Sequence, residues 1–319
     1  MKISVLGCGR WVSFIAWYLS LKDETVIWGR EGSKNIEELI ATRTNGTVTL
    51  SERTTVTTDL DRALENDTIV ISIASQQLSE FGKMLSKRVP DTAHKRFILC
   101  MKGIEETTGR RLTEVFDEAY KKPHDTAVWV GPGHVEEFVN AIPNCMVIDS
   151  DNVEFKKELA ETLSSPLIRF YIGSDLIGSE VGAASKNVIG IAAGMLDGLS
   201  LSSLKGALMS RGAGEIARLI EAMGGDKLSA YGLCHLGDYE ATVFSRHSHN
   251  RAYGEAFVKG EEFDKLAEGV STCSALMLLA KKYQVELPIC TAVYKIIFEH
   301  ADTQATLDSL FSREIKSEF

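Results

Sequence analysis

The first half of the chain alternates short apolar runs with longer amphipathic stretches. The apolar runs are rich in β-branched residues, which favours strands buried on both faces of a parallel sheet. They cover residues 3–6, 25–28, 68–73, 97–99, 127–130 and 145–148. The stretches at 11–21, 37–41, 77–87 and 110–120 carry helical periodicity. This β-α-β order with right-handed crossovers predicts a Rossmann-like, doubly wound α/β domain.

The second half changes character near residues 165–171, where strand signals fade. Ala, Leu, Met and Gly then recur at helical spacing, which predicts an all-α domain. Residues 177–199 are rich in Gly and Ala, although Gly costs about 1 kcal/mol relative to Ala inside a helix. Close packing against other helices or a ligand must offset that cost. At 319 residues two domains are expected, and we place them at 1–172 and 173–319.

Composition narrows the class of protein. The 44% hydrophobic and 25% charged content is ordinary for a globular chain, and no apolar run approaches the ~20 residues of a membrane span. Gly7 follows the start too closely for a signal peptide, so we expect a cytoplasmic protein without stable membrane insertion. Six cysteines without a C-x-x-C pair indicate buried free thiols. The net charge of -9 argues against a nucleic-acid partner.

A glycine turn, G-C-G-R-W-V at 7–12, follows the first predicted strand and opens the first predicted helix. This is the context of a dinucleotide-binding turn. Gly7 permits the tight turn, Gly9 lets the backbone approach a pyrophosphate, and the helix N-terminus offers N–H groups to it. Val12 stands at the third glycine position, which removes the usual device for close helix–strand contact. The alternative is a tight strand-to-helix turn in another α/β protein.

The cofactor choice depends on the end of the second strand. An acidic residue there favours NAD through its ribose hydroxyls. Here Arg30 follows the strand and Glu31 comes next. Arg30 can accept the 2′-phosphate of NADP or be a solvated surface charge, so both NAD and NADP stay open.

Two further motifs follow predicted strands, K-G-I-E at 102–105 and G-P-G-H at 131–134. Open α/β sheets bind ligands at the carboxyl ends of their strands. Lys102 can donate there to a substrate oxygen or a phosphate. Plain strand-exit turns are the alternative.

The helical half holds a lysine, Lys186, beside Asn187 in the Gly/Ala-rich stretch, six residues after Glu180. Poor solvation depresses the pKa of a lysine, which suits acid/base work on an alcohol or ketone. A helix-surface lysine is the alternative. Residues 245–251 mix hydroxyl, amide and cationic donors that can bind a phosphate, or form a surface loop. The His-x-His inside this cluster lacks the further ligands of a metal site, so no metal is expected.

Taken in order, these motifs resemble the bacterial NAD(P)-dependent glycerol-3-phosphate dehydrogenases, over nearly the whole chain. The matching motifs are G-C-G-R-W at 7–11, W-G-R at 28–30, K-G-I-E at 102–105, G-P-G-H-V-E-E at 131–137, S-E-V-G-A-A-S-K-N-V at 179–188, K-G-A-L-M-S-R-G at 205–212, G-D-Y at 237–239, S-H-N-R at 248–251 and E-G-V at 268–270. Nine ordered motifs are far more specific than any single one.

The resemblance implies an NAD(P)-dependent enzyme that interconverts sn-glycerol 3-phosphate and dihydroxyacetone phosphate, for phospholipid or glycerol-phosphate polymer synthesis. Lys186 would accept or donate the proton, Lys102 would contact the substrate and the nicotinamide side, and the cofactor would carry the hydride. Asp238 and Thr242 would orient the lysines and the reacting oxygen. The implied substrate-binding residues are Lys102, Gly131, Gly133, Lys186, Asp238, Ser248, His249 and Asn250. The implied cofactor-binding residues are Gly7, Gly9, Arg10, Trp11, Arg30, Lys102, Val135, His249 and Glu268. A homodimer is a family-level expectation.

Three positions depart from the family pattern, which usually has glycine at Val12, serine at Gly133 and arginine at His249. Arginine grips a phosphate with two parallel hydrogen bonds, whereas histidine is partly neutral near pH 7. Either Arg246 or Arg251 compensates, or the substrate is another phosphorylated or polar hydroxy compound. A non-catalytic dinucleotide sensor is a third possibility, but such a protein has no need of paired lysines.

Overall fold

The computed structural model describes residues 2–315 and divides into two compact units. The first contains the chain up to Lys102 together with Arg110–Glu180. The second contains Gly103–Gly109 and the chain from Val181 onward. The division at residues 172 and 173 stays a prediction about folding domains.

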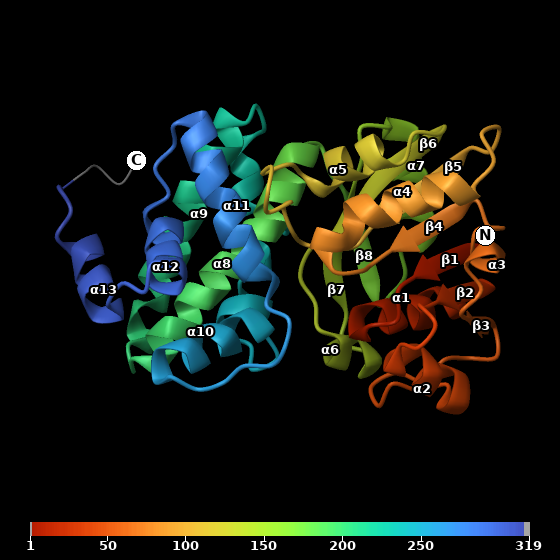
Figure 1. Cartoon of the computed structure of the whole chain (residues 1–319), viewed down its shortest axis with the longest axis horizontal. Coiled ribbons are helices and arrows are strands. Elements are labelled where there is room, and N and C mark those ends of the chain that lie inside the picture. The colour runs from red at the N-terminus through yellow and green to blue at the C-terminus, as the bar shows by residue number, and fades with distance from the viewer. Residues whose placement is uncertain (1, 316–319) are drawn as a thin grey trace. The chain divides into compact units, whose positions relative to one another are not determined.

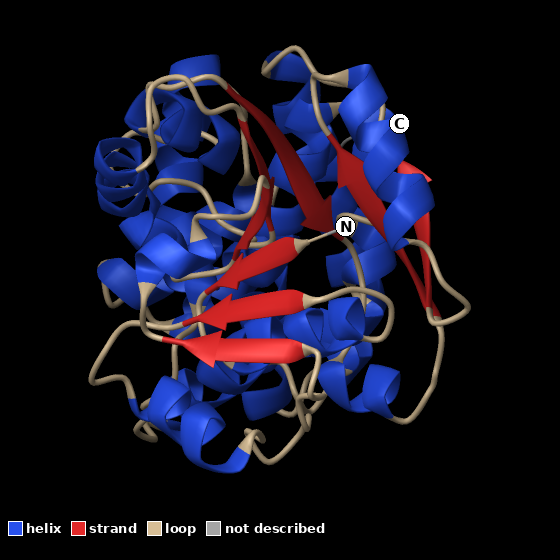
Figure 2. Cartoon of the chain, turned by 90° about the vertical axis from the view of Figure 1, so that its right-hand side faces the viewer, coloured by secondary structure: helices blue, strands red, loops and turns tan. Residues whose placement is uncertain are grey.

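The first unit is built on one eight-stranded sheet (Figure 2). Its strands are β1 (Ile3–Leu6), β2 (Thr25–Trp28), β3 (Thr54–Thr57), β4 (Thr68–Ile71), β5 (Lys95–Leu99), β6 (His124–Val130), β7 (Asn144–Asp149) and β8 (Ile168–Ile172). The strand order in the sheet is β3-β2-β1-β4-β5-β6-β7-β8. From β1 the chain first adds β2 and β3 on one side and then returns to add β4 and the later strands on the other side, as in doubly wound dinucleotide folds. The predicted Rossmann-like fold is therefore confirmed.

Two details of the sheet differ from the prediction. Residues 145–148 were expected to run parallel to the other strands, but β7 pairs with β6 antiparallel, so that expectation is wrong. An apolar run indicates burial and carries no information on direction. Strands β3 and β8 were not anticipated. Both lie at the edges of the sheet, where β8 alternates buried with exposed residues and β3 is largely threonine, so neither forms a continuous apolar run.

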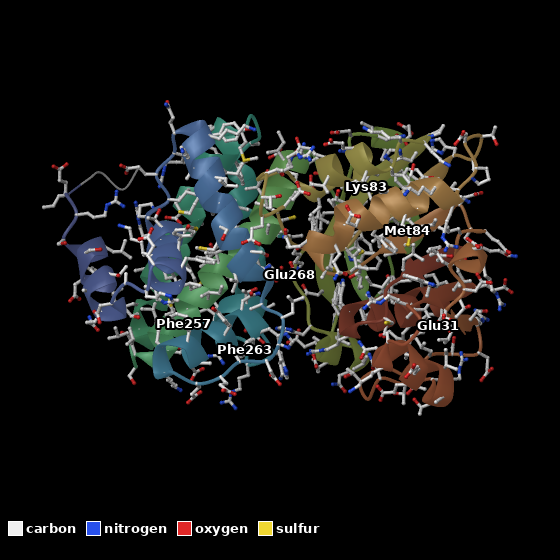
Figure 3. The ribbon with its side chains drawn as sticks, in the orientation of Figure 1. Glu31, Lys83, Met84, Phe257, Phe263 and Glu268 are labelled. Atoms are coloured by element: carbon white, nitrogen blue, oxygen red, sulfur yellow. The ribbon has the colours of Figure 1, made fainter. Side chains whose placement is uncertain are left out.

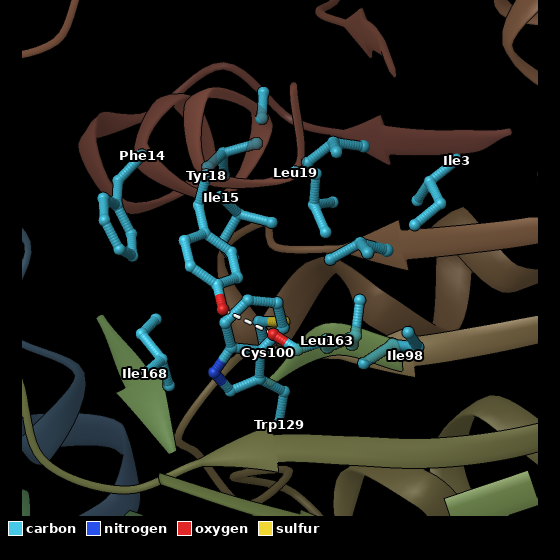
Figure 4. Close-up of a cluster of buried hydrophobic side chains, with 14 of the residues drawn as sticks. Ile3, Phe14, Ile15, Tyr18, Leu19, Ile98, Cys100, Trp129, Leu163 and Ile168 are labelled. Carbon is cyan, nitrogen blue, oxygen red and sulfur yellow. Dashed lines mark hydrogen bonds between the residues drawn. The ribbon is translucent and has the colours of Figure 1, made fainter. Parts of the chain in front are cut away.

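Helices cover both faces of this sheet. Side chains alternate along a strand, so Phe97 and Ile98 of β5 point to opposite faces. Ile98 joins the buried cluster with Phe14 of α1 (Arg10–Ser20) and with side chains of α7 (Val153–Leu163). Burying a side chain such as Phe14 contributes about 1.5–3 kcal/mol. The Tyr18 hydroxyl closes this layer by bonding the Leu163 carbonyl at the end of α7 (Figure 4).

The opposite face is covered by α4 (Leu78–Arg88) and α5 (Leu112–Ala119). The Phe97 ring packs edge-on against Phe116 of α5, with ring centroids 4.7 Å apart. The remaining α-helices of the unit are α2 (Lys34–Thr42), α3 (Leu60–Ala63) and α6 (Val135–Val139). The layered arrangement places the carboxyl ends of β1, β4, β5 and β6 at one edge, where the predicted motifs lie.

The second unit is helical, as expected (Figure 1). Its α-helices are α8 (Leu176–Gly198, whose first turn belongs to the first unit), α9 (Lys205–Ala222), α10 (His249–Lys259), α11 (Glu268–Tyr283), α12 (Pro288–Phe298) and α13 (Thr303–Phe311). Short turns between them include η4 (Leu236–Asp238) and the π-helix η5 (Glu240–Phe244). Among residues 2–315, no helix combines the length and the apolar character that crossing a membrane requires.

The glycines of α8 allow close packing. Gly190 and Gly194 are four residues apart and share one face of the helix. A β-carbon at Gly194 would lie 1.9 Å from the Arg251 carbonyl oxygen, and one at Gly190 would lie 2.6 Å from Cγ2 of Thr242. The close packing expected at these glycines is therefore present, and its energetic effect stays a prediction. All six cysteines are free thiols, as predicted, although Cys8 and Cys145 are only partly buried.

Candidate active site

The glycine turn after β1 has the geometry that a dinucleotide-binding turn needs. Gly7 has a φ of +127°, and its N–H donates to the Trp28 carbonyl over 2.8 Å. A β-carbon there would lie 2.4 Å from the Ser72 carbonyl oxygen, so only glycine fits. At Gly9 the position of a β-carbon has no neighbouring atom within 4 Å, which leaves the backbone open to a ligand.

The N-terminus of α1 is suited to an anion. Gly9 is its N-cap and provides no side-chain cap, and the first turn carries no acidic residue. The first N–H groups and the positive end of the helix dipole are therefore available to a pyrophosphate. Val12, in place of the third glycine, is only 2% exposed and packs under the turn, close to Gly7. The departure at Val12 thus leaves the turn itself intact.

The other expected cofactor residues of this edge lie around the turn. Arg10 forms an ion pair with Glu136 of α6, and the Trp11 ring is tilted against that of Phe14, with ring centroids 5.0 Å apart. Arg30 is exposed on the loop after β2, followed by Glu31 (Figure 3). An exposed arginine at this point is compatible with either dinucleotide.

Lys102 and Gly131, predicted at neighbouring strand ends, are in direct contact. The Lys102 Nζ donates to the Gly131 carbonyl over 2.6 Å. Gly131 and Gly133 both have positive φ values, +122° and +145°. A β-carbon at Gly133 would lie 2.3 Å from Cε2 of Phe138, so the aromatic ring fills the space that a serine would need. Val135, at the start of α6, is buried.

Lys186 lies on α8 and is only 7% exposed. Its Nζ is 2.9 Å from Oδ2 of Asp238 and donates to Oγ1 of Thr242 over 2.6 Å. The Thr242 hydroxyl in turn donates to the Asp238 carbonyl over 2.8 Å. A buried ammonium is stable only when it is paired and hydrogen-bonded. The structure therefore brings Lys186, Asp238 and Thr242 together in one buried, charge-balanced group.

Sequence reasoning missed two residues beneath this group. His235 is fully buried, with Nδ1 2.9 Å from the Gly182 carbonyl and Nε2 2.7 Å from the Tyr239 hydroxyl. A carbonyl only accepts, so Nδ1 carries the proton and Nε2 accepts from Tyr239. Burial lowers the pKa of His235 to about 4, and burial raises that of Tyr239. The signal was a His and a Tyr four residues apart on either side of Asp238.

Glu180, six residues before Lys186 on α8, binds residues of the first unit. It is buried in the first unit, where it binds the Arg111 guanidinium over 2.7 Å and the Thr113 N–H over 2.9 Å. Burial raises the pKa of Glu180, and the Arg111 charge opposes that rise. These contacts fix the start of α5 to the first turn of α8.

The polar cluster at 245–251 surrounds the start of α10. Ser248 caps this helix by accepting the Arg251 N–H over 3.3 Å. His249 is the first helical residue, and its ring lies edge-on to Phe263. The Asn250 Oδ1 accepts the Gly269 N–H over 2.9 Å, which brings the start of α10 beside the start of α11, where Glu268 lies.

The two candidate replacement arginines differ in their surroundings. The Arg251 guanidinium bonds Asp197 over 2.7 Å and Glu255 over 2.9 Å. Arg246 is exposed. Within residues 2–315, no group of three or more His, Cys, Asp or Glu side chains is placed to hold a metal ion.

Comparison with known proteins agrees with this geometry. Residues 2–156 match the model of the NAD-dependent glycerol-3-phosphate dehydrogenase N-terminus, and residues 175–308 match that of its C-terminus. A glycerol-3-phosphate dehydrogenase (NAD(P)+) of Thermoanaerobacter sp. (strain X514) is 35% identical, with 100% of this chain and 99% of the relative covered. One of Clostridium botulinum (strain Eklund 17B / Type B) is 34% identical, with 99% of each covered.

A solved structure extends the comparison to three dimensions. The glycerol-3-phosphate dehydrogenase of Coxiella burnetii has a TM-score of 0.90 at 29% identity, with 98% of this chain and 99% of that chain covered. The resemblance inferred from nine ordered motifs is therefore confirmed. From the glycine turn after β1 to the helices that follow α8, this chain belongs to the family of NAD-dependent glycerol-3-phosphate dehydrogenases.

Proposed function

We propose that this chain interconverts dihydroxyacetone phosphate and sn-glycerol 3-phosphate with NAD(P)(H), and that Lys186 moves the proton. The observation that carries the proposal is the buried group of Lys186, Asp238 and Thr242. The overall reaction consumes one hydride and one proton for each ketone reduced. A buried lysine with a fixed carboxylate partner is suited to supplying that proton.

The contacts around Lys186 support a proton step at this residue. In reduction, the Lys186 ammonium gives its proton to the ketone oxygen of the substrate; in oxidation, the neutral amine takes the proton of the secondary alcohol. The Asp238 carboxylate stabilises the ammonium form of Lys186. The Thr242 hydroxyl donates its hydrogen to the Asp238 carbonyl, so its oxygen is left to accept a hydrogen bond from the Lys186 Nζ. General acid/base catalysis of this kind contributes roughly 10²–10⁴-fold.

The first unit would hold the cofactor. The bound dinucleotide supplies or accepts the hydride at its nicotinamide ring. Its pyrophosphate would lie over Gly9 at the N-terminus of α1, which is supported by the open space there. The residues that we place along the dinucleotide are Gly7, Gly9, Arg10, Trp11, Arg30, Lys102, Val135, His249 and Glu268. Arg30 is exposed and can accept a 2′-phosphate, so we expect both NADH and NADPH to be used.

Lys102 would hold the substrate oxygen and the nicotinamide side. This role is supported by its bond to the Gly131 carbonyl, which fixes Nζ at the carboxyl ends of β5 and β6. Gly131 and Gly133 would line the substrate there. The substrate phosphate would bind at the N-terminus of α10, to Ser248, His249 and Asn250. Because Arg251 is engaged by two carboxylates, Arg246 is the arginine that we assign to compensate for His249.

The finer biological context is also a proposal. We expect a cytoplasmic homodimer, with no nucleic-acid partner, that supplies glycerol phosphate to phospholipid or glycerol-phosphate polymer synthesis. The net charge of -9 supports the absence of a nucleic-acid partner. Light scattering coupled to size-exclusion chromatography measures the oligomeric state. A monomer at micromolar concentration would contradict the expected homodimer.

Steady-state oxidation of NADH and of NADPH with dihydroxyacetone phosphate tests the function. The same assay with dihydroxyacetone and with hydroxyacetone phosphate serves as the control for substrate choice. We expect turnover with dihydroxyacetone phosphate to exceed that with either analogue. Preference for another ketone supports a family member with a different substrate, which the departures at Gly133 and His249 favour. Tight NADH binding without turnover of any ketone supports a sensor.

A further inference from the structure

A partly buried carboxylate, Asp197, is linked to the segment that carries Thr242. Asp197 lies near the end of α8, eleven residues after Lys186, which is about 16 Å along a helix. Its side chain is 15% exposed. At this distance along α8 it cannot act on the reacting atoms, so any effect on the reaction must pass through other residues.

Three side chains bind this carboxylate. Oδ2 accepts from the Lys205 Nζ over 2.6 Å and from the Arg251 guanidinium over 2.7 Å, and Oδ1 accepts from the Ser202 hydroxyl over 2.6 Å. Burial alone would raise the pKa of Asp197, but these hydrogen bonds outweigh burial and lower it. The Asp197 carboxylate therefore binds two cations on the same oxygen.

Both cations continue to the same short segment of backbone. The Lys205 Nζ donates to the Val243 carbonyl over 3.0 Å, and the Arg251 Nε donates to the Ser245 carbonyl over 3.0 Å. This segment is the end of the π-helix η5, where backbone carbonyls lack partners within the helix. The two cations thus supply donors on either side of the end of η5, directly after Thr242.

We propose that Asp197 is a positioning residue for the reaction. Through Lys205 and Arg251 it fixes the backbone after Thr242 and, with it, the hydroxyl that accepts from Lys186. The same segment leads into Ser248 and the start of α10. The inference rests on the proposed function, because it assigns Asp197 to the proton step that Lys186 performs there.

Asp197→Asn is the direct test, since it keeps the shape and removes the charge. Two like charges left close together repel each other, so Lys205 and Arg251 should move off the two carbonyls. We expect kcat for dihydroxyacetone phosphate reduction to fall about 10- to 100-fold, because small misplacements of a catalytic group cost rates of this size. The KM for dihydroxyacetone phosphate should rise several-fold, while the dissociation constant of NADH stays unchanged. Asp197→Glu, which restores the charge, should recover most of kcat.

A double-mutant cycle with Thr242→Val separates positioning from general loss of structure. If Asp197 acts through Thr242, the Asp197→Asn loss in kcat should shrink to about twofold in the Thr242→Val background. An equal factor in both backgrounds overturns the proposal, as does an unchanged kcat in Asp197→Asn alone. Glu221→Gln, which breaks the exposed ion pair with Lys227, is the matched control and should keep full activity.

Further measurements keep the test decisive. If Asp197→Asn fails to fold, as judged by circular dichroism, Lys205→Met is used in the same cycle, because it removes one of the two links and leaves Asp197 paired with Arg251. Wild-type protein without turnover contradicts the proposed function, and this inference with it. An active wild type with an additive cycle contradicts the positioning role alone.

Discussion

The two lysines of the proposed site are held in different ways. Lys102 is partly exposed, and its ammonium bonds a backbone carbonyl at the end of a strand. Lys186 is buried on a helix and is matched by a carboxylate and a hydroxyl. The backbone carbonyl at the strand end is a neutral partner for the Lys102 charge, whereas the Asp238 carboxylate is a charged partner for Lys186. We therefore expect Lys102 of the sheet unit to bind substrate and Lys186 of the helical unit to transfer the proton.

The strongest way to break this comparison is to remove the buried lysine. Lys186→Ala should lower turnover of dihydroxyacetone phosphate by about 10³-fold, because the proton donor is lost. The NADH dissociation constant, measured by fluorescence titration, should stay close to the wild-type value. Lys227→Ala, at an exposed lysine, is the control. Unaltered turnover in Lys186→Ala would remove this residue from the mechanism.

Losing Lys186 leaves the Asp238 carboxylate buried without its partner, which destabilises a fold by roughly 3–5 kcal/mol. Thermal unfolding of the variant must therefore accompany the kinetics. Should the alanine variant not fold, Lys186→Gln retains polar contacts with Thr242 and Asp238 and gives the same kinetic test.

The next largest effect is the contribution of the buried His235, near Lys186, to the free energy of unfolding. The pKa of His235 falls from 6.5 to about 4 because the ring is buried. Between these values the unfolded chain binds a proton that the folded protein does not. The contribution of His235 to stability is therefore complete above about pH 6.5 and declines as the pH falls toward 4, by about 3 kcal/mol.

Urea unfolding of the wild type and of His235→Gln at pH 7 and at pH 4 measures this contribution. Glu180 and Glu215 have pKa values raised by burial and act in the opposite direction, so only the difference between the two proteins isolates the histidine. The stability advantage of the wild type should be about 3 kcal/mol smaller at pH 4. An equal advantage at both pH values would mean that His235 is not held neutral.

A smaller loss of activity is expected when Lys102, the lysine of the sheet unit, is replaced. Lys102→Met keeps the aliphatic stem and removes the ammonium that bonds Gly131. We expect kcat/KM for dihydroxyacetone phosphate to fall about 10- to 30-fold, as for a lost charged hydrogen bond. A loss as large as that of Lys186→Ala would make the two lysines equal partners in the chemistry and end the distinction drawn here.

The smallest effect sharpens the comparison at the proposed phosphate site. His249→Arg should lower the KM for dihydroxyacetone phosphate about three- to tenfold, because arginine is always charged and can form two parallel bonds. Inhibition by inorganic phosphate provides an independent measurement and should become stronger. Weaker inhibition would show that His249 does not face the phosphate.

The fold could be predicted where burial is continuous along the chain. The runs that became β1 and β4 are buried at every position, so their place in the sheet was visible. The edge strand β8 alternates with exposed Arg169 and Tyr171, and its pattern was too weak to recognise. The direction of β7 depends on how the chain returns to the sheet, which no local pattern records.

For the candidate site too, some residues could be predicted from the sequence and others depended on how the helices pack. Motif order alone gave Lys186 and Asp238, which lie 52 positions apart in the sequence. It gave no hint that Arg251, a candidate phosphate ligand, is engaged by Asp197, since this ion pair arises from the packing of α8 against α10. The second ion pair of Arg251, with Glu255, lies within α10. The bond between His235 and Tyr239 was missed because a histidine in an apolar stretch has many ordinary explanations.

The Phe138 ring on Gly133 constrains how this chain could have diverged from its relatives. The ring occupies the volume that a side chain at position 133 would enter, and the glycine has a φ of +145° that other residues rarely adopt. A serine at position 133 would therefore require the Phe138 ring to move out of this volume. The residues that positions 133 and 138 can carry are coupled, and a smaller side chain at position 138 would leave room for serine.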